Sequence, residues 1–132
     1  MKWTSKLVKI LEHPLTCGLS VDNPKTTVLR RQIIREKKFL KLIYKEWYAT
    51  LKGTLPAGKG GVVEIGSGAG FMSEFIPDMV TSDVFFNKGA GLVLDGQCLP
   101  FKDQSLRALV MIDVLHHLPM VRSFFNSAAR CV

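Results

Sequence analysis

The sequence contains no long apolar run and has only three cysteines among its 132 residues. A helix that crosses a bilayer needs about 20 consecutive apolar residues, and no segment approaches that length. The first residues, MKWTSKLVKILEHP, are charged throughout and lack the apolar core of a secretory signal peptide. The cysteines are odd in number and widely spaced, which excludes a disulfide framework and a metal-binding cysteine pair. We therefore expect a cytoplasmic protein without a transmembrane segment.

Acidic residues are scarce in the first 59 residues, which hold 13 lysines and arginines against 4 acids. Residues 60–132 hold 5 basic residues against 7 acidic ones, so the net charge of +7 comes from the N-terminal part. A basic region can contact nucleic acid, an anionic lipid surface or an acidic substrate. It is also the ordinary composition of a solvated helix face, which is the interpretation we favour.

Apolar residues spaced by three and four predict helices in this basic part. Residues 3–12 form a candidate short helix that ends before Pro14. A second helical run covers residues 24–52, with Asn23 as its N-cap. Because that run is long for one globular helix, we expect a break within residues 35–38. Its apolar stripe comprises Val28, Leu29, Ile33, Phe39, Leu40, Ile43, Trp47 and Leu51.

The segment GTLPAGKGG, residues 53–61, is rich in glycine and proline and is predicted to be a connector. It also nearly matches a phosphate-binding P-loop, since Gly53, Gly58 and Lys59 have the required spacing. Two features argue against that function. Gly60 replaces the Ser or Thr that binds the metal ion, and the segment precedes the first strand, whereas a P-loop follows one.

Short apolar runs alternate with helical segments from residue 60 onward. The predicted strands cover residues 62–65, 79–82, 92–94 and 108–113. A short helix is expected to begin at Gly70 and to end before Pro77, and residues 99–105 form a loop. An amphipathic helix follows, with an apolar stripe of Val121, Phe124, Phe125, Ala128 and Ala129. This alternation predicts a parallel sheet covered by helices, the α/β class.

Three glycines in five residues, Gly66, Gly68 and Gly70, follow the first predicted strand. Glycine adopts positive φ without strain and lets a ligand approach the backbone. At the junction of a first strand and a first helix, such a run forms a tight turn beneath a ligand. A glycine pattern by itself is equally consistent with an ordinary turn.

Acids stand at the ends of three predicted strands, namely Glu64, Asp83 and Asp95. Asp83 lies 19 residues after Glu64, where a carboxylate can accept both hydroxyls of a ribose. Asp95 can accept a hydrogen bond from an exocyclic amine such as that of adenine. Ligands in parallel sheets bind outside the carboxyl ends of the strands. Each acid taken alone can instead cap a helix or a turn.

The spacing of the glycines favours a cationic nucleoside over a dinucleotide. Phe71 stands where the dinucleotide pattern G-x-G-x-x-G has its third glycine. Glu64 beside the turn repels a diphosphate, whereas it attracts the sulfonium and ammonium groups of S-adenosylmethionine. This interpretation requires that Asp83 and Asp95 face the turn and that no side chain fills the space above Gly68.

Two motifs resemble those of the class I S-adenosylmethionine-dependent methyltransferases. VVEIGSGAG, residues 62–70, resembles the first motif of the family. Residues 94–119, LDGQCLPFKDQSLRALVMIDVLHHLP, are similar to the D-A-x-x-L-P-F-x-D-x-S…L-H-H stretch of the type 11 branch, which includes quinone-biosynthesis enzymes. The resemblance covers about residues 60–132. It implies a Rossmann-like parallel sheet of order 3-2-1-4, flanked by helices.

The same resemblance implies how the chain is divided. Residues 1–59 would be a basic helical segment, and residues 60–132 the S-adenosylmethionine-binding domain. Domains of this family continue with strands five to seven, so we expect the chain to be the first part of a larger domain. Its fourth strand would then be an apolar edge without a partner.

The resemblance also assigns residues to the cofactor S-adenosyl-L-methionine. Asp83 would bind the ribose, Asp95 with Gly96 and Gln97 would bind the adenine, and Asp113 would line the floor below the methyl group. The methionine part would contact Glu64, Gly66, Ser67, Gly68 and Gly70.

Methyl transfer from a sulfonium requires mainly positioning and a dry site. An oxygen or nitrogen acceptor needs a general base, for which His116 and His117 are candidates. We favour a structural role for both histidines, in the turn before Pro119. The predicted acceptor is a small molecule or a lipid, because Trp47 lies on an apolar stripe and not among the basic residues. An RNA methyltransferase and a non-catalytic interaction module are the alternatives.

Overall fold

A computed structural model describes residue 15 and residues 24–132. Its sheet has four parallel strands: β1 (Gly61–Glu64), β2 (Met79–Asp83), β3 (Leu92–Val93) and β4 (Leu106–Val110). Their order is β3-β2-β1-β4, with β1 paired to both β2 and β4. This confirms the predicted Rossmann-like α/β class and the order 3-2-1-4. The predicted helix over residues 3–12 and the N-cap at Asn23 lie outside the described residues.

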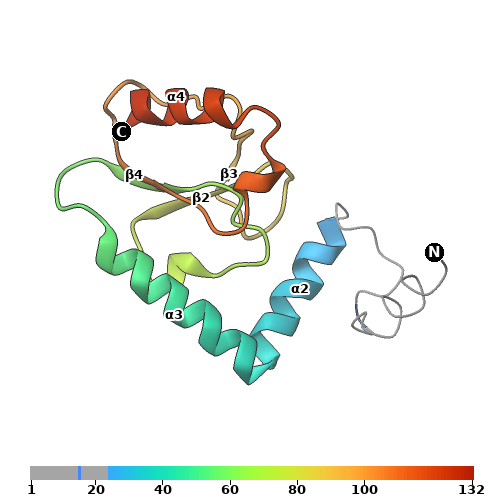
Figure 1. Cartoon of the computed structure of the whole chain (residues 1–132). Helices are drawn as coiled ribbons and strands as arrows, with labels where there is room; N and C mark the ends of the chain where they lie inside the picture. Colours follow the sequence, from blue (N-terminus) through green and yellow to red (C-terminus); the bar gives the residue numbers. More distant parts are fainter. Residues whose placement is uncertain (1–14, 16–23) are drawn as a thin grey trace.

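Helices cover both faces of the sheet (Figure 1). The helix α3 (Lys38–Thr54) and the 3-10 turn η1 (Met72–Glu74) lie on one face, and α4 (Val121–Cys131) lies on the other. A second 3-10 turn, η2 (Leu115–His117), connects β4 to α4. Because β1 is covered on both faces, its two valines are buried in separate clusters, one under each helix layer.

The predicted break in the basic helical run is confirmed. One residue, Lys37, separates the helix α2 (Pro24–Glu36) from α3. Its backbone is extended, with φ −78° and ψ 104°. This bend lets Ile34 of α2 and Leu40 of α3 join the same apolar cluster as β1. The helical segment before residue 60 therefore shares a core with the sheet.

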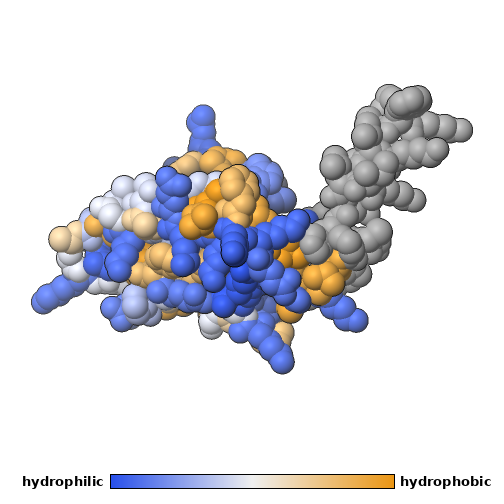
Figure 2. Space-filling view, turned by 90° about the horizontal axis from the view of Figure 1, so that it is seen from below, coloured by the Kyte–Doolittle hydropathy of each residue, from blue (hydrophilic) through white to orange (hydrophobic). Residues whose placement is uncertain are grey.

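The predicted apolar stripe of this segment is partly wrong. Trp47 is 46% exposed, whereas its neighbour Tyr48 is 1% exposed, and Val28 and Phe39 are also on the surface. The buried face of α3 is shifted by one residue because Leu40, Tyr44, Tyr48 and Leu51 follow a strict spacing of four and three. The face turned toward the viewer in Figure 2 mixes hydrophobic patches with hydrophilic surface. The position of Trp47 no longer argues against a nucleic-acid acceptor.

Several other predicted boundaries also change, and β1 lies one residue earlier than predicted. The helix expected after Gly70 is only the 3-10 turn η1, because Pro77 leaves too few residues for longer helical hydrogen bonding. The second and third strands lie where they were predicted, although β3 has only two residues. The fourth strand covers Leu106–Val110 and not residues 108–113. Its partner β1 ends at Glu64, so residues beyond Val110 have no ladder to join.

Helix α4 forms where it was predicted, but the stripe assigned to it is wrong in part. Phe124 is 2% exposed and packs against the sheet, while Phe125 is 54% exposed and Val121 is also on the surface. The buried positions run from Phe124 through Ala128 to Cys131. Phe125 faces the free edge of β4, where no strand among residues 24–132 provides a partner.

Two further findings concern the described residues alone. None of their helices has both the length and the hydropathy of a bilayer-spanning segment. Cys98 and Cys131 are both free thiols, whereas Cys17 lies outside the described residues.

The two adjacent phenylalanines of α4 provide a matched test of this packing. We expect Phe124→Ala to lower the free energy of unfolding by about 3–5 kcal/mol, because it empties a fully buried site. Phe125→Ala should change it by less than about 1 kcal/mol, since the ring is half exposed. Urea denaturation of both variants checks this, and equal losses would contradict the described orientation of α4.

Candidate functional site

The glycine-rich turn follows β1 at the carboxyl end of the sheet. Gly66 and Gly68 have φ values of 67° and 46°, in the left-handed region that favours glycine. A Cβ on Gly66 would lie 2.6 Å from Val114 Cγ2, and one on Gly70 would lie 2.7 Å from the Tyr48 hydroxyl. At Gly68, in contrast, the nearest atom to such a Cβ is a backbone oxygen at 3.8 Å. Packing thus explains two of the glycines, and only Gly68 opens onto free space.

Side chains from three separate elements hold this turn in place. The Tyr48 hydroxyl of α3 accepts a hydrogen bond from the backbone N–H of Phe71 at 3.0 Å. The Asp83 carboxylate at the end of β2 accepts one from Gly68 N–H at 2.9 Å. Arg31 of α2 donates through Nη2 to the carbonyl of Gly68 at 3.0 Å. The basic helical segment therefore contributes directly to the site.

Glu64 ends β1 directly beneath the turn, and its side chain is buried. The residue is 4% exposed, and its Oε2 has no hydrogen-bond partner. Burial raises the pKa of Glu64 to about 7; the charge of Arg31 opposes this rise and that of Asp83 adds to it. A buried carboxylate without a partner is costly, so this position favours a cation or a hydrogen-bond donor beside it.

Asp83 faces the glycine turn, as the nucleoside interpretation requires. In addition to Gly68 N–H, its carboxylate accepts hydrogen bonds from Asn87 Nδ2 at 3.1 Å and from Phe85 N–H at 3.2 Å. A carboxylate has about four acceptor positions. Asp83 therefore retains room for about one further donor, such as one ribose hydroxyl.

Asp95 makes a local turn at the end of β3. Its Oδ1 accepts a hydrogen bond from Gln97 N–H at 2.8 Å, and its side chain is exposed. Gln97 in turn accepts from Met120 N–H at 3.2 Å through Oε1. Gly96 is buried against Ile65 and Leu118. The residues predicted to bind the adenine thus form one surface at the end of β3, where Gly96 lies beside Ile65, the residue before the glycine turn.

A small polar cavity of about 130 Å³ lies between α2, the turn, η1 and β2. Its charged, polar and small lining residues include Arg31, Arg35, Glu64, Ser67, Glu74 and Gly89. The Ser67 hydroxyl is buried there without a partner. Typical ligand pockets measure about 300–1,000 Å³, so this cavity accommodates a small group and not a whole nucleoside. Arg31 donates to the carbonyl of Gly68, but none of its atoms lies within 4 Å of the position that a Cβ on Gly68 would take.

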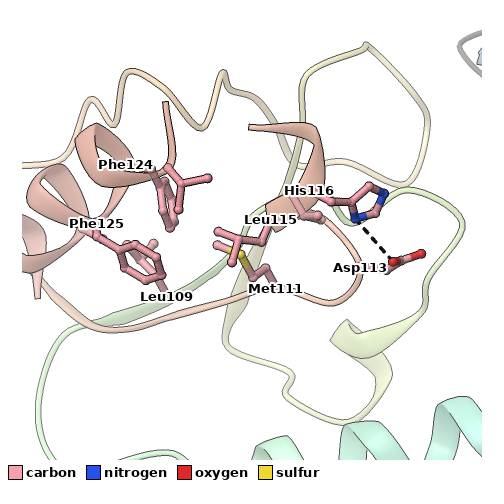
Figure 3. A pocket seen from close by; sticks show the side chains of 10 residues that line it. Leu109, Met111, Asp113, Leu115, His116, Phe124 and Phe125 are labelled. Atoms are coloured by element: carbon pink, nitrogen blue, oxygen red, sulfur yellow. Dashed lines mark ion pairs between the residues drawn. The ribbon is translucent and has the colours of Figure 1, made fainter. Parts of the chain in front are cut away.

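A larger cavity of about 740 Å³ lies between β4, η2 and α4 (Figure 3). Its walls are mainly apolar, with Leu109, Met111 and Phe125 among them. Asp113 and His116 stand together at one end, with Asp113 Oδ1 3.6 Å from His116 Nδ1. This end adjoins the glycine turn, because the Val114 side chain lines the cavity and also packs on Gly66.

Asp113 and the two histidines follow β4, as their position in the sequence predicts. Asp113 has a φ of 58°, a conformation that aspartate tolerates better than most residues. The rings of His116 and His117 have centroids 3.9 Å apart, and both side chains are on the surface. Their exposure leaves them accessible to a ligand.

Sequence reasoning missed Arg31, Tyr48 and Asn87 as parts of this site. Two glycines are related to Tyr48 and Arg31. A Cβ on Gly70 would collide with the side chain of Tyr48, and a Cβ on Gly89 would collide with that of Arg31. These collisions can be recognised only once the fold brings the segments together.

The chain was compared with known proteins, and no family model, no curated protein and no solved structure matches it.

The hydrogen bond from Phe71 N–H to Tyr48 gives a first prediction for the site. Tyr48→Phe leaves a buried N–H without a partner, so we expect a loss of about 1–3 kcal/mol in unfolding free energy. Tyr44→Phe is the matched control, because no hydrogen bond of the Tyr44 hydroxyl is present among the described residues. Chemical denaturation measures both, and equal effects would show that the hydroxyl of Tyr48 does not hold the turn.

The raised pKa of Glu64 gives a second prediction for the site. Its ordinary value is 4.5 and its value in the folded chain is about 7, so ionisation destabilises the fold increasingly as the pH rises through this interval. Glu64→Gln removes that cost. Its stability relative to the unaltered chain should therefore increase by about 2–3 kcal/mol between pH 5 and pH 8.

Thermal or urea unfolding across this pH range checks the effect. Glu74→Gln is the control, because Glu74 is half exposed and pairs with Arg35. A pH-independent difference for Glu64→Gln would mean that the carboxylate is not buried without a partner.

Proposed function

We propose that the chain is an S-adenosyl-L-methionine-dependent methyltransferase, or the cofactor-binding part of one, acting on a small-molecule or lipid acceptor. The observation that carries this proposal is the unpartnered carboxylate oxygen of Glu64, buried beneath a turn whose Gly68 opens onto free space. A cationic ligand on the turn would supply the charge that this carboxylate lacks. A diphosphate would be repelled by it.

For each part of the proposed ligand, the site has a residue or surface that could contact it. Glu64 and Ser67 offer a free carboxylate oxygen and a free hydroxyl to the amino-acid end of the ligand. Asp83 has one acceptor position open for a ribose hydroxyl. Asp95, Gly96 and Gln97 form the surface beyond it for the adenine. Because the polar cavity is small, the nucleoside would lie outside it, over Gly68.

The apolar cavity beside β4 supports a small apolar or lipid acceptor. When bound, S-adenosylmethionine supplies a methyl group on a sulfonium, which is already activated for displacement. The chain orients the acceptor against the turn and excludes water with its apolar walls. For an oxygen or nitrogen acceptor, His116 would take the proton at a ring nitrogen, and Asp113 beside it would stabilise the resulting imidazolium.

A non-catalytic interaction module is the second candidate. It is favoured by one observation, the edge of β4, which within residues 24–132 is hydrogen-bonded on one side only and is flanked by the exposed Phe125. Such an edge is a template for another strand. An RNA acceptor is a further alternative, since Trp47 is exposed on the basic helix α3.

Calorimetry with S-adenosylhomocysteine tests the proposed function. We expect micromolar binding by the unaltered chain and at least a tenfold loss in Gly68→Ala, because a Cβ there projects into the space assigned to the ligand. Gly58→Ala is the control: Gly58 also has positive φ and open space, but it lies in the connector before β1. It should bind as the unaltered chain does.

Absence of binding by the unaltered chain would refute the methyltransferase proposal and leave the interaction module. Normal binding by Gly68→Ala would place the nucleoside elsewhere on the molecule.

A further inference from the structure

Helix α3 carries a second set of apolar side chains, on the side that faces away from the sheet. They recur at helical spacings of three and four, and none of them is buried: Phe39, Leu42, Ile43 and Trp47. Phe39 is 73% exposed and Leu42 is 65% exposed. Single apolar residues on a surface are ordinary, whereas a contiguous stripe of large ones marks an interaction surface. We call these four residues the outer stripe.

Lysines border the outer stripe on one side. They recur at spacings of three, four and seven residues, so they share one side of the helix: Lys38, Lys41, Lys45 and Lys52. All four are exposed, and none forms an ion pair with another of residues 24–132. Glu46 is the one acid of α3. Figure 2, which views the molecule from the side of α2 and α3, shows hydrophobic patches between hydrophilic side chains.

This combination suits the surface of an anionic lipid bilayer. Helices that lie in the headgroup region bury Trp, Phe and Leu at the acyl boundary, and nearby lysines are attracted to the charged lipids. Single-stranded RNA would instead need aromatic rings that are free for stacking. Leu42 and Ile43 offer no ring, and the Trp47 ring already contacts that of Tyr44, with centroids 5.3 Å apart. The outer stripe therefore favours lipid over RNA.

We propose that the outer face of α3 docks the protein on an anionic lipid bilayer, with Phe39, Leu42 and Trp47 in the headgroup region and the four lysines against the charged lipids. The opposite face of α3 packs on the sheet, so docking requires no rearrangement of the fold. The proposal goes beyond the proposed function and does not rest on it, because these residues line neither of the two cavities described above.

Co-sedimentation with vesicles tests the docking. The two probes are vesicles of phosphatidylcholine alone and vesicles in which phosphatidylserine replaces about a third of it. We expect the chain to bind the anionic vesicles at least about tenfold more tightly, and high salt to weaken this binding. Equal binding to both vesicles, or binding to neither, would overturn the proposal and leave the proposed function untouched.

Trp47 reports directly on the orientation. The chain has two tryptophans, so Trp3→Phe leaves Trp47 as the one source of indole emission. Its emission should shift to shorter wavelength when anionic vesicles are added, because the ring moves from water into the headgroup region. Vesicle binding without this shift would mean that another surface makes the contact.

Paired substitutions assign the charge contribution to α3. Lys38→Gln with Lys45→Gln should weaken binding to anionic vesicles by at least about tenfold. Lys88→Gln with Lys102→Gln is the matched control, since it changes the net charge equally at two exposed lysines outside α2 and α3. The control should bind as the unaltered chain does. Equal losses in the two pairs would show that net charge alone drives binding, which contradicts a docking face.

Phe39→Ala with Leu42→Ala tests the apolar contribution. We expect at least about a tenfold loss of vesicle binding, because two large side chains no longer enter the headgroup region. Phe86→Ala is the control, since Phe86 is 78% exposed in the loop after β2, and it should keep full binding. Full binding by the α3 pair would overturn the proposal. If that pair does not fold, the lysine pairs decide.

Polyuridylate is the probe for the competing partner. Binding of this RNA by the unaltered chain and its loss in Lys38→Gln with Lys45→Gln, together with no binding of anionic vesicles, would overturn the bilayer and identify RNA as the partner of α3.

Discussion

The burial of the Glu64 carboxylate is the constraint on which the rest of the site depends. β1 delivers this side chain to the inside of the molecule, where ionisation is costly and the pKa rises to about 7. The fold does not remove that cost by a direct ion pair. It places the guanidinium of Arg31 across a cavity, where its charge stabilises the carboxylate without occupying Oε2. Under the proposed function, a ligand that supplies the missing donor would offset this cost.

The basic helical segment has a role beyond the one that its composition indicates. Its charge suggested a solvated face or a surface for an anionic partner, and much of that face is indeed exposed. However, Arg31 reaches the glycine turn from α2, and Tyr48 reaches it from α3. The break at Lys37 makes both contacts possible, because a straight helix could not turn its two halves toward the same loop. The boundary at residue 60 thus separates two compositions, while the site is built from both sides of it.

How far the sequence predicts this molecule depends on whether a feature is local. The α/β class and the break in the helical run follow from local apolar patterns, and the approach of Asp83 to the turn follows from its place at a strand end. The strand order was predicted from the family resemblance. Trp47 and Phe125 were misassigned because adjacent aromatics fit a helical stripe almost equally well, and only the position of the sheet decides which is buried. The role of Asp95 in binding adenine stays a prediction; in the fold its carboxylate accepts a hydrogen bond from Gln97 N–H. Arg31 was unpredictable, since 37 residues separate it from its partner Gly68.

The glycines show how much a short motif can be trusted. In the sequence, all three were attributed together to one tight turn, either beneath a ligand or as an ordinary turn. In the fold, Gly66 makes room for Val114 and Gly70 makes room for Tyr48, so both would be required even if nothing bound. Within the motif, the open space at Gly68 and the unpartnered polar atoms of Glu64 and Ser67 are the features that support a ligand. A chain could keep the other two glycines for packing alone after losing the ligand.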